Sequence, residues 1–244
     1  MNCIQFGDRK INFTIQRGKR KKTVAIHVDH MTTITVSAPQ YLNEEKIRMI
    51  VQKKARWILD KQEQMERKKH DNPVKEFVSG ESFPYLGKNY RLKVIRSSPE
   101  AEEKCNLVNG RFLIELNGQS DGNSERASVK KALADWYVEH AKETIAERVE
   151  RFAQQLGKWP RSIKIKNQKK QWGSCSSHGA VRFNWKIIMT PISVLDYVIV
   201  HELCHLIYPH HSAQFWQKVQ SIIPDYKKKR DLLKEYSYQM EVFN

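Results

Sequence analysis

The segment His201-Glu202-Leu203-Cys204-His205 holds residue types that can bind a metal ion and move a proton. On a helix, side chains four residues apart lie on one face, about 5–6 Å from each other. His201 and His205 could therefore bind one Zn²⁺. Glu202 lies one position further round the helix, where its longer carboxylate could take a proton from a bound water. The spacing predicts a hydrolytic metal site on one helical turn.

A third ligand would complete such a site and still leave one position open for water. His211 stands where the extended zinc motif places its third histidine, and His210 is the alternative. That motif has a glycine where this chain has Tyr208, which is followed by Pro209. Proline disfavours helical geometry in the residue before it and cannot continue the hydrogen bonding. We therefore expect the first helix to end there and Ser212 to cap a second one.

The residues before the motif favour a buried site over an exposed helix face. Residues 194–200 are almost wholly apolar, so most sides of this helix should face the interior. Two histidines and a glutamate in that setting are costly unless they are paired or bind a metal.

Composition indicates a globular protein with reduced thiols. The chain has 244 residues, 40% of them hydrophobic, which is enough for one good core or two modest ones. It has neither an apolar run of the ~20 residues that span a membrane nor a signal-type segment at its start. These features predict a cytoplasmic protein with no membrane partner. Four widely spaced cysteines form no Cys-x-x-Cys pair, as is typical of free thiols. They are Cys3, Cys105, Cys175 and Cys204.

The charge balance predicts acidic or polyanionic partners. Lysine and arginine number 43 against 27 aspartates and glutamates, a formal net charge of +16. A positive field of this size attracts nucleotides, nucleic acids or acidic substrates. Basic runs lie at 17–22 and 227–230, although each run taken singly is also compatible with ordinary solvated surface.

Hydrophobic periodicity predicts an α+β fold in two lobes. The first forty residues alternate as in an antiparallel meander, a helix follows from Asn43 to about residue 70, and strands return between 74 and 116. The polar stretch 117–124 is the clearest linker, and a long helix should run from about 125 to 156. We therefore expect a β-rich N-terminal lobe at 1–122 and a metal-binding lobe at 123–244.

A strand is expected directly before the metal-binding helix. Apolar residues alternate with polar ones over 180–188, as in a half-buried strand. Its apolar members are Val181, Phe183, Trp185 and Ile187. Thr190 should cap the following helix, with Pro191 at its first position. If the strand is a sheet edge, an extended peptide could pair with it; a purely structural strand is the alternative.

Four segments together resemble one family, the YgjP-like metal-dependent hydrolases of the zincin superfamily of metallopeptidases. The segments are Gln171-Trp172-Gly173-Ser174-Cys175-Ser176-Ser177, Asn184-Trp185, residues 195–205 and His211-Ser212-x-x-Phe215-Trp216. The resemblance extends along nearly the whole chain. It implies one zinc ion held by His201, His205 and His211, Glu202 as general base, and a minigluzincin-like α+β catalytic lobe. One departure is Gln171, where the family usually has arginine.

Peptide-bond hydrolysis is the leading predicted reaction. Zn²⁺ would lower the pKa of its water towards ~7, while Glu202 takes the proton and delivers it to the leaving amine. A second electrophile is normally needed for the oxyanion, and the sequence does not select one. Candidates for this role or for other substrate contacts are Tyr208, His210, His178, Arg182 and Asn184.

Two alternatives stay open at this point. A divalent site in a strongly basic protein could hydrolyse phosphate anhydrides such as nucleoside triphosphates, although no phosphate-cradling glycine loop is present. The protein could also be a DNA-associated protease or a nucleic-acid-binding protein. The oligomeric state is not predicted by the sequence.

Overall fold

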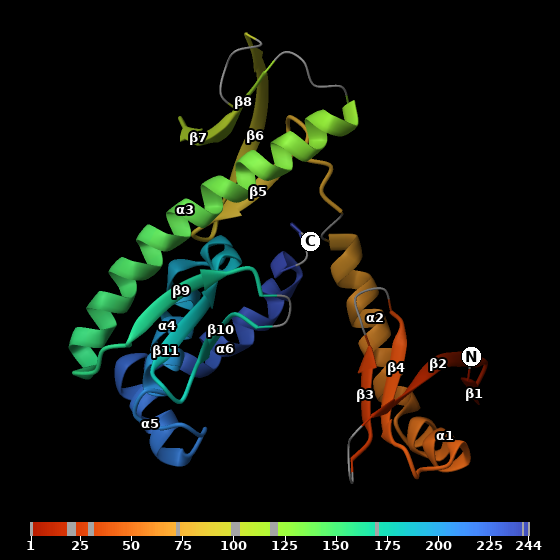
Figure 1. The fold of residues 1–244 in the computed structure, drawn as a ribbon. Coiled ribbons are helices and arrows are strands. Elements are labelled where there is room, and N and C mark those ends of the chain that lie inside the picture. Colours follow the sequence, from red (N-terminus) through yellow and green to blue (C-terminus); the bar gives the residue numbers. More distant parts are fainter. Residues whose placement is uncertain are drawn as a thin grey trace. The chain divides into compact units, whose positions relative to one another are not determined.

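The computed structural model describes residues 2–18, 23–28, 32–71, 74–98, 103–117, 122–168, 171–240 and 242–243. The chain divides into two compact units, Met1–Val74 and Lys75–Asn244. Helices and sheets are mixed in both, which confirms the predicted α+β class (Figure 1). In the described part of the chain, no helix combines the length and apolar character needed to cross a membrane.

The first unit is a four-stranded sheet with two helices. Its strands, in the order β1-β2-β4-β3, and its helices are β1 (Asn2–Phe6), β2 (Arg9–Gly18), β3 (Ala25–Val28), β4 (Ile34–Pro39), α1 (Glu44–Lys53) and α2 (Ala55–Asp71). The predicted antiparallel meander is wrong in one respect, because β4 lies between β2 and β3 and pairs in parallel with β2. This strand takes the central place since Ile34, Val36 and Ala38 are all buried.

The second unit begins with a sheet that shares its core with the longest helix. The sheet has the order β5-β6-β8-β7, and the elements are β5 (Ser82–Tyr85), β6 (Lys88–Ser97), β7 (Lys104–Val108), β8 (Arg111–Asn117) and α3 (Gly122–Leu156). Phe112 of β8 is fully buried and packs edge-on against Trp136 of α3, with ring centroids 4.9 Å apart. Figure 1 shows α3 running from this sheet towards the strand that begins at Ser162.

The division of the chain differs from the predicted boundary at residue 122. Phe112, Leu116, Leu133 and Trp136 lie in one hydrophobic core, so the β5–β8 sheet belongs to the same unit as α3. The predicted boundary therefore falls within the second unit, although residues 118–121 of the predicted linker lie outside the described residues.

A three-stranded sheet and three helices complete the second unit. They are β9 (Ser162–Lys166), β10 (Gly173–Cys175), β11 (Ala180–Asn184), α4 (Ile192–Cys204), α5 (Ala213–Ile222) and α6 (Tyr226–Glu235), with short 3₁₀ helices η1 (Trp185–Met189) and η2 (Tyr236–Met240). The sheet order is β10-β11-β9, so β11 is the central strand and not the edge that a peptide could join.

The strand predicted at 180–188 ends early, at Asn184. The Asn184 side chain accepts a hydrogen bond from the Lys186 amide and caps η1, so Trp185 and Ile187 are helical and buried. Thr190 ends η1 instead of capping α4, and Pro191 takes the cap position of α4.

The β5–β6 turn lies against the start of α4. The Leu86 amide donates to the Ile188 carbonyl at 2.8 Å. Gly87 has a φ of +82°, and a Cβ there would lie 2.9 Å from the Cα of Pro191. Both the turn and the close approach therefore require glycine at this position.

Candidate metal centre

Two neighbouring helices and the turn between them bring the predicted metal ligands together. His201 and His205 lie at the C-terminal end of α4, with ring centroids 5.0 Å apart. The helix stops before Pro209, as predicted. Ser212 caps α5, and its Oγ accepts a hydrogen bond from the Phe215 amide at 3.3 Å, which confirms that prediction. His211 directly precedes this cap, so the turn presents it to α4.

The three imidazoles converge on one point. One ligand nitrogen from each of His201, His205 and His211 lies within 4.8 Å of the others. The Nε2 atoms of His201 and His211 are 3.0 Å apart. Zn–N bonds of roughly 2.0–2.1 Å in a tetrahedron place ligand nitrogens about 3.3 Å from each other. The donor set therefore fits a zinc ion after small ring movements. His210 lies outside this cluster.

Hydrogen bonding and burial keep lone pairs available in the cluster. The Nδ1 of His205 donates to the Tyr208 carbonyl at 3.1 Å, which leaves its Nε2 free to face the site. The pKa of His201 is lowered to about 3, first by burial and then by His205 and His211. Burial also lowers the pKa of His205. The rings of His201 and His205 are thus neutral at pH 7, the form that binds metal. The Nδ1 of His201 is buried and finds no hydrogen-bond partner among the described residues.

An aromatic wall from α5 and α6 supports the histidines. The fully buried Phe215 ring lies within 5.0 Å of all three imidazoles, measured between centroids. Trp216 stacks on His211, with centroids 5.4 Å apart and planes 18° from parallel. Tyr226 stacks in turn on Trp216 at 5.2 Å, and the Arg230 guanidinium lies 5.7 Å from the Trp216 ring. Through Trp216, these contacts from α6 hold the His211 ring in place.

Glu202 is buried beside the cluster, against strand β10. Only 7% of the residue is exposed, and burial raises its pKa to about 7. A Cβ added to Gly173 would lie 2.7 Å from Glu202 Cγ and 2.8 Å from Oε1. The segment around Trp172 therefore packs on Glu202, and glycine leaves the space that the carboxylate fills. The small residues after Trp172 in the sequence suggest a tight loop packed near this helix in a supporting role, but no local signal links Gly173 to Glu202 in particular.

The other predicted contact residues do not gather in the cluster. Arg182 and His178 are exposed on β11 and on the β10–β11 turn, respectively. His210 is also exposed, and its carbonyl accepts from the Ser212 amide. Tyr208 contributes its backbone carbonyl to His205.

Asn184 is used for structure. It is fully buried, and its side-chain amide donates to the Gln168 carbonyl at 2.7 Å while its oxygen caps η1. The side-chain amide thus holds the loop before β10. The buried polar group of Asn184 is therefore hydrogen-bonded within the protein and needs no substrate contact.

A partly buried ion pair that sequence analysis did not predict joins α3 to α4, the helix that carries His201 and His205. The Arg148 guanidinium donates through Nε to Asp196 Oδ1 at 2.7 Å and through Nη2 to Oδ2. Their side chains are 16% and 15% exposed. This bidentate contact fixes α4 one turn before its first histidine. Asp196 is the one charged residue within the apolar run 194–200, which in retrospect was the available signal.

Comparison with known proteins identifies the family. Residues 22–236 match the family model described as YgjP-like, metallopeptidase domain. No curated protein matched the chain. A solved structure, the metallopeptidase zymogen of Pyrococcus abyssi abylysin, is similar at 22% identity and a TM-score of 0.35. That similarity covers 36% of this chain and 90% of the other. Because the family match spans most of the sequence, the protein belongs to the YgjP-like metallopeptidase-domain family.

Proposed function

We propose that the protein is a zinc-dependent peptidase in which His201, His205 and His211 hold one Zn²⁺ and Glu202 is the general base. The observation that supports this is the convergence of three imidazoles next to a buried carboxylate. Bound zinc supplies a water of lowered pKa and polarises the carbonyl of the scissile bond.

Glu202 takes a proton from the attacking water and delivers it to the leaving amine. Without a cation in the site, burial raises the pKa of Glu202 to about 7, and the charge of a nearby zinc ion would favour the ionised carboxylate that accepts a proton. Gly173 fixes one side of the carboxylate, so the base has little freedom to turn away.

An extended peptide is the substrate form that suits the neighbouring sheet. The predicted pairing with the strand before α4 is not available, because β11 is hydrogen-bonded on both sides. Within the described part of the chain, β10 pairs with β11 alone, and its Gly173 touches Glu202. We propose that the substrate backbone pairs with the outer edge of β10, which places it beside the base.

The test combines metal analysis with a peptidase assay. Purified full-length protein should contain one zinc per chain and cleave casein. Glu202→Gln should retain zinc and lose turnover, while His211→Ala should lose zinc. His210→Ala is the matched control, since this adjacent histidine is exposed and outside the cluster.

A wild type that binds no zinc would refute the proposed site. Hydrolysis confined to a nucleoside triphosphate panel would replace peptidase activity with the phosphohydrolase alternative. A cytoplasmic location and nucleotide or nucleic-acid binding through the basic surface remain predictions from the sequence.

A further inference from the structure

The sheet β10-β11-β9 has one face towards the core and one face towards solvent. Paired residues of neighbouring strands share a face, and successive residues alternate between the two faces. Val181 and Phe183 of β11 are fully buried, so their rows face the core. The row between them consists of Ser174, Arg182 and Lys164, which are paired across β10, β11 and β9. This row therefore lies on the solvent face.

The solvent face carries cations that no nearby carboxylate balances. Arg182 and Lys164 are exposed, as is Lys166 two positions further along β9. None of the three has an ion-pair partner in the part of the chain that the structure describes. Residues 151–195, which include the whole sheet, contain nine lysines and arginines and no aspartate or glutamate. At the chain's average, 27 acidic residues in 244, about five would be expected in a run of this length.

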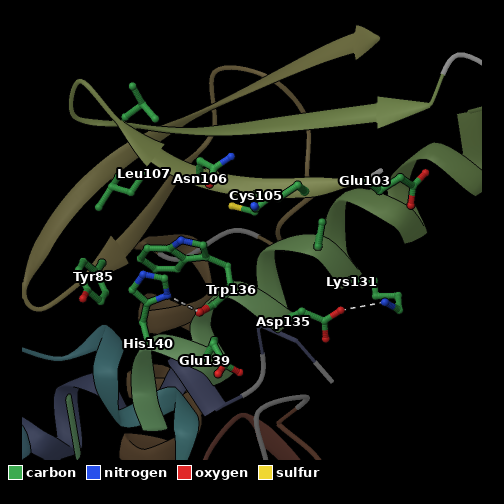
Figure 2. Close-up of a pocket in the computed structure, with 13 residues that line it drawn as sticks. Tyr85, Glu103, Cys105, Asn106, Leu107, Lys131, Asp135, Trp136, Glu139 and His140 are labelled. Atoms are coloured by element: carbon green, nitrogen blue, oxygen red, sulfur yellow. Dashed lines mark hydrogen bonds and ion pairs between the residues drawn. The ribbon is translucent and has the colours of Figure 1, made fainter. Parts of the chain in front are cut away.

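Charges at the groove between β7 and α3 are arranged differently (Figure 2). There Lys131 pairs with Asp135 at 2.8 Å, as the dashed line in Figure 2 shows, and Lys142 pairs with Glu139 at 2.9 Å. Opposite charges this close cancel each other at distances beyond the pair. The acid-free sheet face therefore has the stronger field for a ligand of opposite charge.

Strand β10 turns two of its residues outward, towards the proposed substrate. Hydrogen bonds from the Asn184 amide to β10 and from the Ser176 amide to β11 mark the two ends of the pairing between these strands. Because the direction of bonding alternates along an antiparallel pair, Gly173 and Cys175 point their N–H and C=O groups away from β11. No described residue bonds to these groups. A strand added there brings its residues opposite Gly173, Ser174 and Cys175 in turn.

A substrate residue opposite Ser174 faces the same side of the sheet as Arg182. Two strand spacings, about 10 Å, separate its backbone from β11. The serine side chain between them is short, so it leaves the space above β10 open to a long side chain from either direction. The substrate residue opposite Gly173 instead faces the core side, where Glu202 touches the glycine. The two substrate positions are adjacent, so the one that faces Arg182 lies next to the residue beside the proposed base.

We propose that the protein selects peptides with a glutamate opposite Ser174, and that Arg182 binds this carboxylate. Lys164 and Lys166 strengthen the positive field around it. The inference rests on the proposed peptidase function. Glutamate fits better than aspartate, because its additional methylene group shortens the gap to β11. The contact is remote from the reacting bond and holds substrate and transition state equally, so the preference appears in KM and not in kcat.

The first test maps where the full-length zinc-loaded protein cuts an equimolar library of synthetic peptides, read by mass spectrometry. Glutamate should be enriched at one fixed position within two residues of the cut. The best sequence is then made with glutamate, aspartate, glutamine or lysine at that position. The glutamine peptide should have a KM about fivefold higher than the glutamate peptide, or ~1 kcal/mol, near the upper end for an exposed ion pair. The aspartate peptide should lie between them, and the lysine peptide should have the highest KM.

Variants of Arg182 identify the residue that makes the contact. Arg182→Gln should bring the KM values of the glutamate and glutamine peptides within twofold of each other. Arg182→Glu should reverse the order, so that the lysine peptide has a lower KM than the glutamate peptide. The matched control is Arg91→Gln, which removes the same charge from an exposed strand residue of the β5–β8 sheet and should keep the fivefold ratio. Melting curves confirm that each variant is folded.

A binding measurement separates substrate choice from turnover. In protein that carries Glu202→Gln, fluorescein-labelled versions of the four peptides should show the same order of affinity in fluorescence anisotropy. The advantage of the glutamate peptide should shrink as salt is added, because ions screen an exposed pair.

Cleavage without preference at that position, or a glutamate preference that survives Arg182→Glu, would overturn this inference and leave the peptidase proposal standing. A protein that cleaves no peptide of the library would overturn both. Salt-dependent retention of DNA that Arg182→Gln abolishes, with no glutamate preference, would show that the face binds nucleic acid instead.

Discussion

Replacing Gly173 with alanine tests whether β10 sets the position of the proposed base. The new Cβ would lie 2.7 Å from Glu202 Cγ, whereas carbon atoms prefer about 3.5–4.0 Å. The Glu202 side chain must therefore retreat by about 1 Å. It is 7% exposed, so the surrounding core limits where it can go.

The expected loss of catalytic rate follows from this displacement of Glu202. A misplacement of about 1 Å at a catalytic group costs roughly 10²-fold in rate, which corresponds to about 2.7 kcal/mol in the activation free energy. Zinc affinity should stay the same, because Glu202 is not among the three converging ligands. The free energy of unfolding should fall by about 1–3 kcal/mol, as is usual for an overpacked core.

The assay follows cleavage of a fluorogenic casein digest under saturating and subsaturating substrate, with zinc content and the melting temperature measured in parallel. We expect kcat to fall about 100-fold with little change in KM. Gly18→Ala is the matched control, because a Cβ there meets nothing within 4 Å. A Gly173→Ala protein that is folded, zinc-loaded and as fast as wild type would refute the proposed contact with the base.

Three further predictions concern thiols, metal affinity and stability. Burial raises the pKa of Cys105 and Cys204 to about 12 each, so at pH 8 both should resist Ellman's reagent until denaturant is added; native labelling, mapped by mass spectrometry, would contradict this. Trp216→Leu should weaken zinc binding about tenfold in a chelator competition, and Trp216→Phe much less; equal affinities would show that the stack on the third histidine is dispensable. Arg148→Met leaves the Asp196 carboxylate without its partner, so the unfolding free energy in urea should fall by about 1–3 kcal/mol; an unchanged midpoint would mean that solvent replaces the arginine.

Features that depend on residues close in sequence could be predicted. The break before Pro209 and the cap at Ser212 each follow from the chemistry of a few neighbouring residues, and the structure confirms both. The family resemblance is likewise confirmed by the match over residues 22–236. It could be predicted because each of its motifs is a short unbroken run of residues. The assignment of His201, His205 and His211 as metal ligands and of Glu202 as the proton acceptor stays a proposal.

Features that depend on distant residues could not be predicted. The polar stretch after Leu116 looked like a domain boundary, but the buried faces of β8 and α3 meet across it in one core. The alternation around Trp185 suggested a longer strand, whereas the Asn184 side chain starts a buried 3₁₀ turn there. Gly173 and Glu202 lie 29 positions apart, so their contact has no local pattern.

The close approach of Gly87 to Pro191 decides which end of α4, the helix of the proposed zinc ligands His201 and His205, can move. The β5–β6 turn packs closely against Pro191, the cap of α4, and the Leu86 amide is hydrogen-bonded to Ile188 of the preceding η1. The N-terminal end of α4 is therefore anchored to the β5–β8 sheet. Any movement that would admit or release the proposed ion must therefore occur at the opposite end, where His211 lies on a solvent-exposed turn.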